Sequence, residues 1–576
     1  MMLNALSYEL EKVAHELEDS KTRIVERVLE IMFPEAASGA KPARAIVYAQ
    51  PIENNIKVSL QNQMLVKRRI HNIYNPLEPI IKEIVFSPTL EVRLTACDIA
   101  YIAYERNMFK ISNLFYKDIV KDYKHTLAAG EIILGIELND SNTLLEDVAL
   151  YIDIKNTHQK EMFHYYLKQV KCFHDDIEIK VEEGYNVPIN SLDIENIINR
   201  NYTHLSETMQ EVNEYYFDNF YTLKGTIKHK KIEQYSPVYK PFEEISNNNA
   251  KPIIWIKMVF PESLVPQIID NVSFTTNCFP VINKKYHSVG KTLENFLSYI
   301  VLETENNIYL DIESVIDPHN NHYEIKEFKE GVLEEGNAVL RTGGVSRFDS
   351  RTASELLHNV LDLLKDETSS FTGLGKDFMN SSLAEINQLL ASVDQQAKES
   401  SFFKNNDPYL MIKPKIDKNI ENTFVINYWS TCAEEGNDIK TGTILECSDL
   451  NFVSKNVTLM TNTVGGTNKQ TNRDRILAYR NALLTRGRIV TFADIKAFGF
   501  NHFKSSITDI KIEKGTRKEI SVKAGFSRTV DIYIKTNPEE KQHLSNSQWK
   551  YLCDSFNKEL KNRSSNVFPY RLFIEE

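Results

Sequence analysis

The chain has 576 residues, of which 42% are hydrophobic and 26% are charged, and its formal net charge at pH 7 is -11. This balance is typical of a soluble globular protein with several buried cores, and the length predicts roughly three to five domains. The acidic balance argues against nucleic acid as the main partner, and the composition argues against long disordered stretches.

Targeting segments and disulfides are not expected. No stretch approaches the roughly 18 consecutive apolar residues of a membrane span, and the N-terminus lacks the pattern of a signal peptide. The six cysteines contain no CxxC pair, which favours a reducing, cytoplasmic compartment. They are Cys97, Cys172, Cys278, Cys432, Cys447 and Cys553.

Residues 3 to 32 contain neither Gly nor Pro, and apolar residues recur among them at intervals of seven. The pattern predicts a single long helix, about 45 Å from end to end, with a coiled-coil-like stripe. Such a helix can extend beyond its own domain to pack on a partner, or it can be an ordinary core helix. The stripe positions that we expect to take part in assembly are Leu10, Leu17 and Ile24.

Strands dominate the middle of the chain. After Pro34, a strand at 45–49 is followed by runs that alternate apolar and polar residues, which predicts a β-sandwich. LEDVALYIDI (145–154) predicts another strand, and an apolar face at 162–170 predicts the helix that follows it. These elements give a first domain at 1–125, with the long helix, and a second α+β domain with a helical insert at 126–250.

Three further domains are predicted. Strands define a β-rich domain at 251–340, in which VSFTTNCFPVIN (272–283) carries one of them. Capping boxes at 352–355 and 382–385 each open a helix of a connector at 341–400. The fold class is therefore α+β: an elongated multidomain protein with a long N-terminal helix, β-sandwich-like middle domains and a C-terminal α/β sandwich module.

The C-terminal module, 401–576, reads as strands and helices in the order of a split βαβ sandwich. A helix is predicted at 472–485, a strand at RIVT (488–491), and a short helix capped by Thr491 with Asp494. Two strands, a helix capped by Ser545, and a last strand complete the module.

A metal site is one possible reading of the densest group of potential ligands. These residues are His158, His164, Cys172, His174 and Asp176. No HExxH or paired CxxC spacing accompanies them, so a polar loop after a helix is the favoured interpretation. No metal and no cofactor are therefore predicted.

An enzyme is a second possible reading. Cys278 could act as a nucleophile with His287 as its base, as in a thiol hydrolase, but the apolar neighbours of Cys278 favour a buried structural thiol. GLGKD (373–377) lacks the first Gly and the final Ser or Thr of a phosphate loop. RTGGVSRFDSR (341–351) could cradle an anion, but a flexible turn at a domain boundary is favoured.

A third possible reading is nucleic-acid binding through 455–535. This segment holds 16 Lys or Arg residues and 6 Asp or Glu residues, which gives a local charge of about +10. Its basic and aromatic residues cluster near one predicted helix, and an acidic protein surface would suit them equally well. They are Arg473, Arg475, Arg480, Arg486 and Arg488, with Phe492, Phe498, Phe500 and Phe503.

TTNCFPVINKK (275–285) predicts the end of a strand and a turn. Pro280 has no N–H to donate and is expected to end the pairing of the strand. Asn277 and Asn283 are expected to cap the backbone groups that the turn leaves unpaired.

Several of these stretches resemble the TssF family, the baseplate wedge subunits of bacterial type VI secretion systems. The long first helix, its Phe-Pro end and AKPARAIVYAQP (40–51) are similar to the opening of that family. LEDVALYIDI with HYYL, and TTNCFPVIN with its Asn277, Pro280 and Asn283, resemble later family stretches. NYWSTCAEEGNDIKTGT (427–443), which carries Trp429, and RDRILAYRNALLTRGRIVTFADI (473–495) resemble the wedge module of contractile phage-tail-like machines.

The resemblance implies a non-enzymatic, structural protein without cofactors, located in the cytoplasm at the inner face of the cell envelope. It implies a second copy of this chain and TssG-like, TssE-like and TssK-like subunits as partners, around a spike hub and below a sheath. The resemblance departs in two places, since LSYELEKVAHELED replaces a tyrosine-rich opening and FPEAA replaces Y-P-H-Y-L, which indicates a divergent branch.

Overall fold

The structure is a computed structural model that describes residues 39–70, 80–122, 127–155, 159–187, 204–261, 266–293, 298–304, 307–327, 336–341, 408–413, 422–447, 449–468, 474, 477–478, 481, 485, 488–519, 525–564 and 568–575. The predicted helix at 3–32 and both predicted capping boxes, at 352–355 and 382–385, lie outside these residues. The chain divides into two compact units, Met1–Glu35 with Tyr286–Ser430 and Ala36–Lys285 with Thr431–Glu576. The finer division into five domains remains a prediction.

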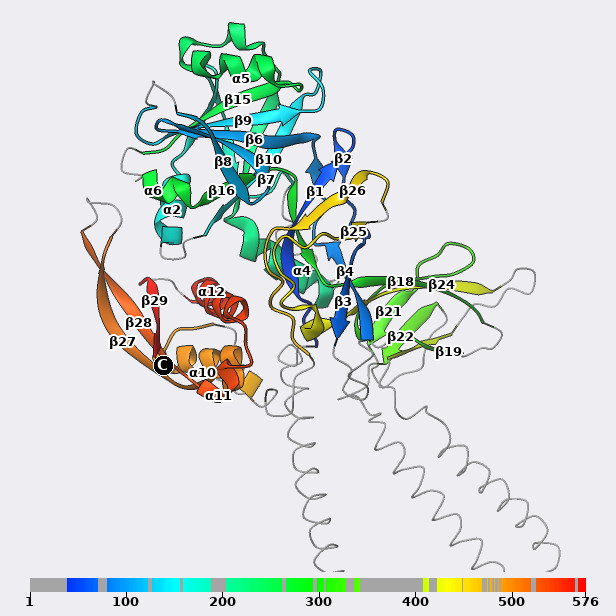
Figure 1. Ribbon diagram of the computed structural model, residues 1–576. Helices are drawn as coiled ribbons and strands as arrows, with labels where there is room; N and C mark the ends of the chain where they lie inside the picture. The colour runs from blue at the N-terminus through cyan, green and yellow to red at the C-terminus, as the bar shows by residue number, and fades with distance from the viewer. Residues whose placement is uncertain are drawn as a thin grey trace, which may run out of the picture. The chain divides into compact units, whose positions relative to one another are not determined.

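The larger unit contains a β-sandwich (Figure 1). One layer is a seven-stranded sheet in the order β12-β11-β15-β9-β6-β7-β8, and the other is a four-stranded sheet in the order β13-β14-β10-β16. The strands of the first sheet are β6 (Cys97–Tyr104), β7 (Asn107–Asn113), β8 (Tyr116–Asp122), β9 (Glu131–Leu138), β11 (Lys171–His174), β12 (Ile177–Ile179) and β15 (Ile253–Val259). Those of the second are β10 (Leu145–Ile154), β13 (Val181–Glu183), β14 (Phe220–Ile227) and β16 (Val272–Thr275).

Apolar side chains on the two faces of the larger sheet belong to two different cores. In β9, Ile132 and Leu134 join the core between the two sheets, whereas Ile133 joins a second core on the outer face of the larger sheet. Successive side chains of a strand point to opposite faces, so strands with apolar residues on both sides can be covered on both. Strands β6 and β9 of the predicted sandwich lie in this sandwich, whereas β1 (Arg44–Pro51), β3 (Met64–Ile70) and β4 (Ile80–Pro88), which were predicted with them, lie in a different sheet.

Short helices cover the outer face of the seven-stranded sheet. They are η3 (Ile232–Gln234), η4 (Pro237–Phe242) and α5 (Glu243–Asn248), and Phe242 stacks on Trp255 with ring centroids 4.7 Å apart. Gly135 makes room for the indole, since a Cβ there would lie 2.7 Å from Trp255. Two more helices belong to this region, α2 (Lys160–Leu167), which buries Phe163 in the core between the sheets, and α6 (Pro266–Asp270).

A six-stranded sheet in the order β25-β3-β4-β17-β1-β26 joins distant parts of the chain. Its strands are β1 (Arg44–Pro51), β3 (Met64–Ile70), β4 (Ile80–Pro88), β17 (Cys278–Ile282), β25 (Glu446–Cys447) and β26 (Phe452–Leu459), and the pair β2 (Ile56–Lys57) and β5 (Arg93–Leu94) lies apart from it. Because β1 pairs with both β17 and β26, this sheet combines three of the five predicted domains. Helix α4 (His204–Phe217) contacts β17.

The C-terminal module is an α/β layer structure. Strands β27 (Ile507–Lys518) and β28 (Phe526–Thr536) are antiparallel, and β29 (Tyr570–Glu575) runs parallel to β28. Helices α10 (Phe492–Phe503) and α12 (Asn546–Arg563) cover one face of the sheet and share its core, as Figure 1 shows. The short elements η7 (Lys504–Ser506) and α11 (Pro538–Lys541) complete the module.

Both caps predicted for this module are confirmed. The side chain of Thr491 accepts a hydrogen bond from the backbone of Asp494 in a full capping box, and Ser545 caps α12. The strand predicted at RIVT is wrong. Only Ile489 forms an isolated bridge there, because the chain turns at once into the cap of α10.

The described residues of the smaller unit form two further sheets, in the orders β18-β24-β20 and β19-β23-β22-β21. Their strands are β18 (Lys285–Thr292), β19 (Ser298–Val301), β20 (Ile308–Ile316), β21 (Glu324–Glu327), β22 (Asn337–Arg341), β23 (Tyr409–Ile412) and β24 (Thr423–Thr431). Leu410, Phe424 and Ile426 are fully buried in its core. The α+β class is therefore confirmed in the described residues, with strands in several sheets and few helices.

Candidate assembly site

Asn277 lies at the corner where the chain leaves one sheet and enters another. Strand β16 ends at Thr275 and β17 begins at Cys278, so the single strand predicted over 272–283 is in fact two strands of different sheets. Asn277 has a φ of 55°, in the left-handed region that Asn tolerates better than most residues. Its side chain accepts a hydrogen bond from Thr95 N at 3.1 Å and donates one to Cys97 O at 2.8 Å.

Pro280 does not end the pairing of its strand, which corrects the prediction. It lies opposite Ile46 in the middle of the β1–β17 ladder. Its carbonyl accepts a hydrogen bond from Thr89 N at 3.2 Å, so it points away from β1. In an antiparallel strand the N–H and C=O of one residue point to the same side, so the missing N–H is not needed by β1.

Asn283 joins three segments of the chain. Its Nδ2 donates to Val85 O in β4 at 2.8 Å, and its Oδ1 accepts from Thr431 Oγ1 at 2.9 Å and from Cys432 N at 2.7 Å. Its own backbone N–H donates to Ala43 O at 2.7 Å. Both asparagines therefore bind backbone groups of segments far away in the sequence, and not the groups of the local turn that they were predicted to cap.

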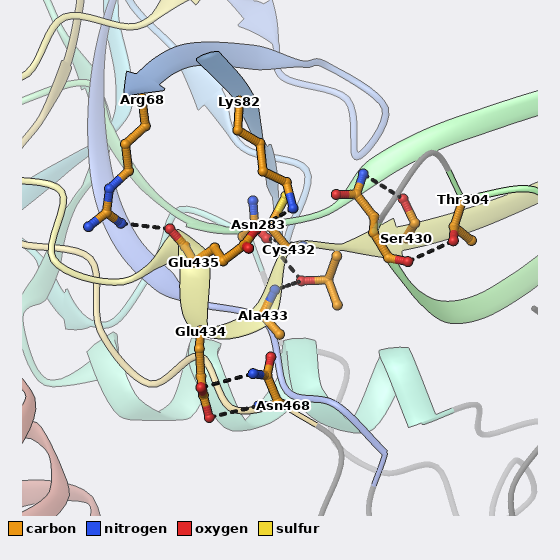
Figure 2. A network of polar contacts seen from close by, with 12 residues as sticks. Arg68, Lys82, Asn283, Thr304, Ser430, Cys432, Ala433, Glu434, Glu435 and Asn468 are labelled. Atoms are coloured by element: carbon orange, nitrogen blue, oxygen red, sulfur yellow. Dashed lines mark hydrogen bonds and ion pairs between the residues drawn. The ribbon is translucent and has the colours of Figure 1, made fainter. Parts of the chain in front are cut away.

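The segment that Asn283 holds is the loop from Thr431 to Asn437, called here the 431–437 loop, which contains η6 (Ala433–Gly436). Figure 2 shows Arg68 and Lys82 reaching it from β3 and β4. Arg68 Nη1 donates to the carbonyls of Glu435 and Asn437, each at 2.7 Å, and Lys82 forms an ion pair with the Glu435 carboxylate.

Residues that follow β26 fix the other side of the 431–437 loop. The side chain of Asn437 exchanges two hydrogen bonds of 2.8 Å with the backbone of Gly466. The Glu434 carboxylate accepts hydrogen bonds from the backbone and side chain of Asn468, at 3.2 and 2.9 Å (Figure 2). The loop is therefore tied to β3, β4, β17 and the segment after β26.

Two glycines permit close approaches at this place. A Cβ on Gly436 would lie 3.1 Å from the Cβ of Ala43 and 3.2 Å from the Cγ of Asn283. A Cβ on Gly466 would lie only 2.3 Å from the carbonyl oxygen of Ala433. Backbone and side chains thus pack too tightly for any larger residue at Gly466.

The polar groups of this site hold the 431–437 loop in a fixed position. Its buried polar groups are amides, a hydroxyl and backbone groups, none of which titrates near neutral pH. The ion pair of Lys82 with Glu435 lies at the surface, where such pairs contribute about 0–1 kcal/mol. Buried hydrogen bonds therefore determine where the loop lies, and the exposed carboxylates of Glu434 and Glu435 are presented to solvent from it.

Trp429 belongs to the smaller unit and is a buried anchor there. It is 4% exposed, its Nε1 donates to Glu313 Oε2 at 2.9 Å, and its ring lies 4.9 Å from that of Tyr286. His287 lies in the same unit, where its Nε2 is 2.7 Å from Ser430 Oγ and its ring stacks on Tyr428.

Cys278 is a buried structural thiol, as predicted. It is 4% exposed, burial raises its pKa well above that of a free thiol, and its Sγ lies 3.4 Å from Thr276 O. A thiol with a raised pKa is a poor nucleophile at neutral pH because the thiolate is the reacting form. All six cysteines are free thiols.

The predicted ligand-capable cluster does not converge on one point in the described residues. Cys172 and His174 lie on β11, and the Nδ1 of His174 is 3.3 Å from Trp255 O. His164 lies on α2, and His158 lies outside the described residues. Across the described ranges, no three His, Cys, Asp or Glu side chains are arranged to hold a metal ion.

The basic segment is described only in part. Arg488 is exposed, whereas Arg473, Arg475, Arg480 and Arg486 lie outside the described residues, as do Leu10, Leu17 and Ile24. The proposed aromatic partners of nucleic acid are mostly core residues: Phe498 and Phe503 are buried beneath α12, and only Phe492 is substantially exposed. Buried rings cannot stack on bases, so Phe498 and Phe503 cannot take the part that the nucleic-acid interpretation suggested for them.

Several residues of the site were not singled out from the sequence. They are Arg68, Lys82, Thr431, Gly436, Asn437 and Gly466. A signal existed for Gly466, since it belongs to a Gly-Gly pair, which marks a turn or a close backbone approach. No local signal identifies Arg68 and Lys82, because their partners lie more than 350 residues away.

Comparisons with known proteins gave matches among solved structures. No family model and no curated protein matches the sequence. A chain of the type VI secretion system TssK-TssF-TssG baseplate subcomplex, determined by cryo-electron microscopy, is similar with a TM-score of 0.42 and 10% sequence identity. The match covers 100% of the present chain and 95% of that chain. Within the described segments, no helix is both long and apolar enough to cross a membrane.

Proposed function

We propose that this chain is a structural wedge subunit of the baseplate of a contractile injection machine, of the TssF kind. It would assemble with TssG-like, TssE-like and TssK-like subunits and with a second copy of itself, around a spike hub and below a sheath. The proposed role requires no reaction and no cofactor, and it would be carried out in the cytoplasm at the inner face of the cell envelope.

One observation supports the proposal above the others. The stretches on which the sequence resemblance to TssF rests are far apart in the chain, yet three of them meet in the larger unit. AKPARAIVYAQP contributes β1, TTNCFPVIN contributes β17, which pairs with β1, and the 431–437 loop of the third stretch is held by Asn283. Chance likenesses of unrelated segments would have no reason to converge in one packed region.

The mechanism that we propose is mechanical. Baseplate subunits hold contacts between wedges that change when the sheath contracts, which requires rigid bodies with separate interfaces. The six-stranded sheet supplies such a rigid body, because it joins strands from residues 44 to 459 by hydrogen bonds that are buried. The predicted stripe of Leu10, Leu17 and Ile24, and the arginines of 473–488, would then serve as partner surfaces.

Co-expression with the TssG-like and TssK-like proteins of the same genome tests the proposal. We expect a complex that contains two copies of this chain per TssG-like subunit, measured by native mass spectrometry. A matched pair of variants is available in β17 and next to it: Cys278→Ala should still assemble, whereas Asn283→Ala should assemble less, even at a temperature where its circular dichroism is native. A monomer that binds neither partner would refute the proposal.

A further inference from the structure

Arg44 of β1 is a buried cation with no carboxylate at ion-pair distance in the described residues. It is 4% exposed, and its Nε is buried with no hydrogen-bond partner. Its guanidinium lies over the ring of Tyr551, 5.0 Å from the centroid, and makes no hydrogen bond or ion pair within the described part of the chain. Buried arginines are normally paired, so this one requires an explanation.

The neighbouring charges do not balance. Three cations, Lys41, Arg44 and Arg563, influence the same region as two carboxylates, Glu211 and Glu559. Both carboxylates are already engaged by the other cations: Glu211 lies 3.3 Å from Lys41 Nζ, and Glu559 lies 3.5 Å from Arg563 Nη2. Arg44 therefore shares the negative charge of Glu211 with Lys41, and no carboxylate of the described residues forms an ion pair with it.

The neighbours of Arg44 limit how a ligand could approach its guanidinium. A Cβ on Gly465 would lie 3.0 Å from Arg44 Nε, so the Nε side is closed by the chain. The two terminal nitrogens are not fully buried. Because Tyr551 covers the face of the guanidinium, an oxyanion would meet the terminal N–H groups in the plane of the guanidinium, which is the geometry of a bidentate hydrogen bond to two oxygens.

We propose that Arg44, supported by Lys41, is a binding site for a small oxyanion, a phosphate or carboxylate group that approaches the terminal nitrogens. The oxyanion adds a negative charge beside Arg44 and Lys41 and accepts hydrogen bonds from the terminal nitrogens of Arg44, which have no partner in the described residues. This site does not depend on the proposed wedge role, because its argument uses only the charges and contacts around Arg44.

The site lies where three elements meet. Arg44 belongs to β1, Glu211 and Tyr215 to α4, and Tyr551 to α12, whose ring packs on Tyr215 with centroids 5.3 Å apart. A bound oxyanion therefore strengthens the contact of α12 with α4 and β1. It should slow the opening of these elements, which native-state hydrogen exchange measures.

The test uses the full chain and inorganic phosphate at constant ionic strength, with sodium chloride as the balancing salt. Ligand that binds only the folded state raises its Tm in a saturable manner. We expect such a rise, and slower hydrogen exchange in α4 and α12, for the unaltered chain. Arg528→Met is the matched control, since Arg528 is exposed and loses the same charge, and it should behave like the unaltered chain.

Arg44→Met keeps the length of the side chain and removes the guanidinium, and it should weaken phosphate binding by about tenfold or more. If this variant does not fold, Arg44→Lys retains the charge without the planar fork and should bind more weakly than Arg44. No saturable response of the unaltered chain would overturn the proposal. So would an unchanged response of the Arg44 variant, because binding would then occur elsewhere.

A parallel titration with acetate distinguishes the two sources of the oxyanion. A response to phosphate alone identifies a phosphate group as the ligand. An equal response to acetate identifies a carboxylate, such as an acidic side chain of another protein. Either response supports the site only if it is lost in Arg44→Met and retained in Arg528→Met.

Discussion

The Oδ1 atom of Asn283 lies 2.7 Å from the backbone nitrogen of Cys432, a residue 149 positions further along the chain. The same oxygen accepts a hydrogen bond from the hydroxyl of Thr431, and the amide nitrogen of Asn283 donates one to the carbonyl of Val85 in β4. One side chain therefore links the start of the 431–437 loop to β4 of the six-stranded sheet.

Replacing Asn283 should destabilise the contact between the 431–437 loop and β4. Asn283→Ala leaves Val85 O and Cys432 N buried without their partner, and each unsatisfied buried group costs about 1–3 kcal/mol. We expect the free energy of unfolding to fall by about 2–4 kcal/mol, measured by urea denaturation. Asn546→Ala is the control, since Asn546 is exposed at the start of α12 and its loss should change stability by less than about 0.5 kcal/mol. Equal effects of the two variants would contradict the role of Asn283.

Local signals in the sequence were sufficient for many elements. The pattern of apolar and polar residues in 131–138 predicts β9, because a period of two can be recognised within a single strand. Thr491 and Asp494 predict a helix cap, because the two partners lie within four residues of each other. The type of these two elements therefore followed from neighbours in the sequence.

The contacts of the site could not be predicted from residues that are neighbours in the sequence. Pro280 was expected to end its strand, but whether a missing N–H matters depends on which side of β17 carries a partner at that position. Asn283 was expected to cap a turn, and its partners are supplied by residues 85 and 431–432. Pairing across such distances depends on the whole packed sheet, which no single window of sequence contains.

Cys278 should be inert and dispensable. Cys278→Ala removes a thiol that is 4% exposed and leaves only a small cavity, so we expect a loss of about 1 kcal/mol or less. In the native state, alkylation at neutral pH should reach Cys447 and Cys553, which are only partly buried, before Cys278, because burial raises the pKa of Cys278 and blocks access to it. Peptide mass spectrometry after timed alkylation measures this order. Rapid labelling of Cys278 would instead revive the thiol-hydrolase interpretation.

Gly466 should not tolerate a side chain. A methyl group there would lie 2.3 Å from Ala433 O, and the contact is with backbone, which cannot rotate away. We expect Gly466→Ala to destabilise the larger unit by about 3 kcal/mol or more, since the 431–437 loop must shift and break the Asn437 hydrogen bonds. Gly290→Ala is the matched control, because a Cβ there meets only Thr423 at 3.7 Å. Thermal unfolding of both variants measures this difference, and similar Tm values would show that the 431–437 loop can move to make room for the methyl group.

His164 of α2 should make the protein less stable in acid. Both ring nitrogens are buried without hydrogen-bond partners in the described residues, and this burial, together with nearby Lys160, lowers the pKa of His164 to about 4. An unfolded histidine titrates near 6.5, so between about pH 6.5 and 4 the unfolded state binds more protons than the folded state. Stability from this group is therefore present above pH 6.5 and is lost as the pH falls through this window, by up to about 3 kcal/mol. Urea denaturation at pH 7 and pH 4.5 measures the loss, which should be smaller in His164→Leu. His543→Leu, at an exposed position, should retain the full loss, and an identical pH dependence of the two variants would assign the effect to other groups.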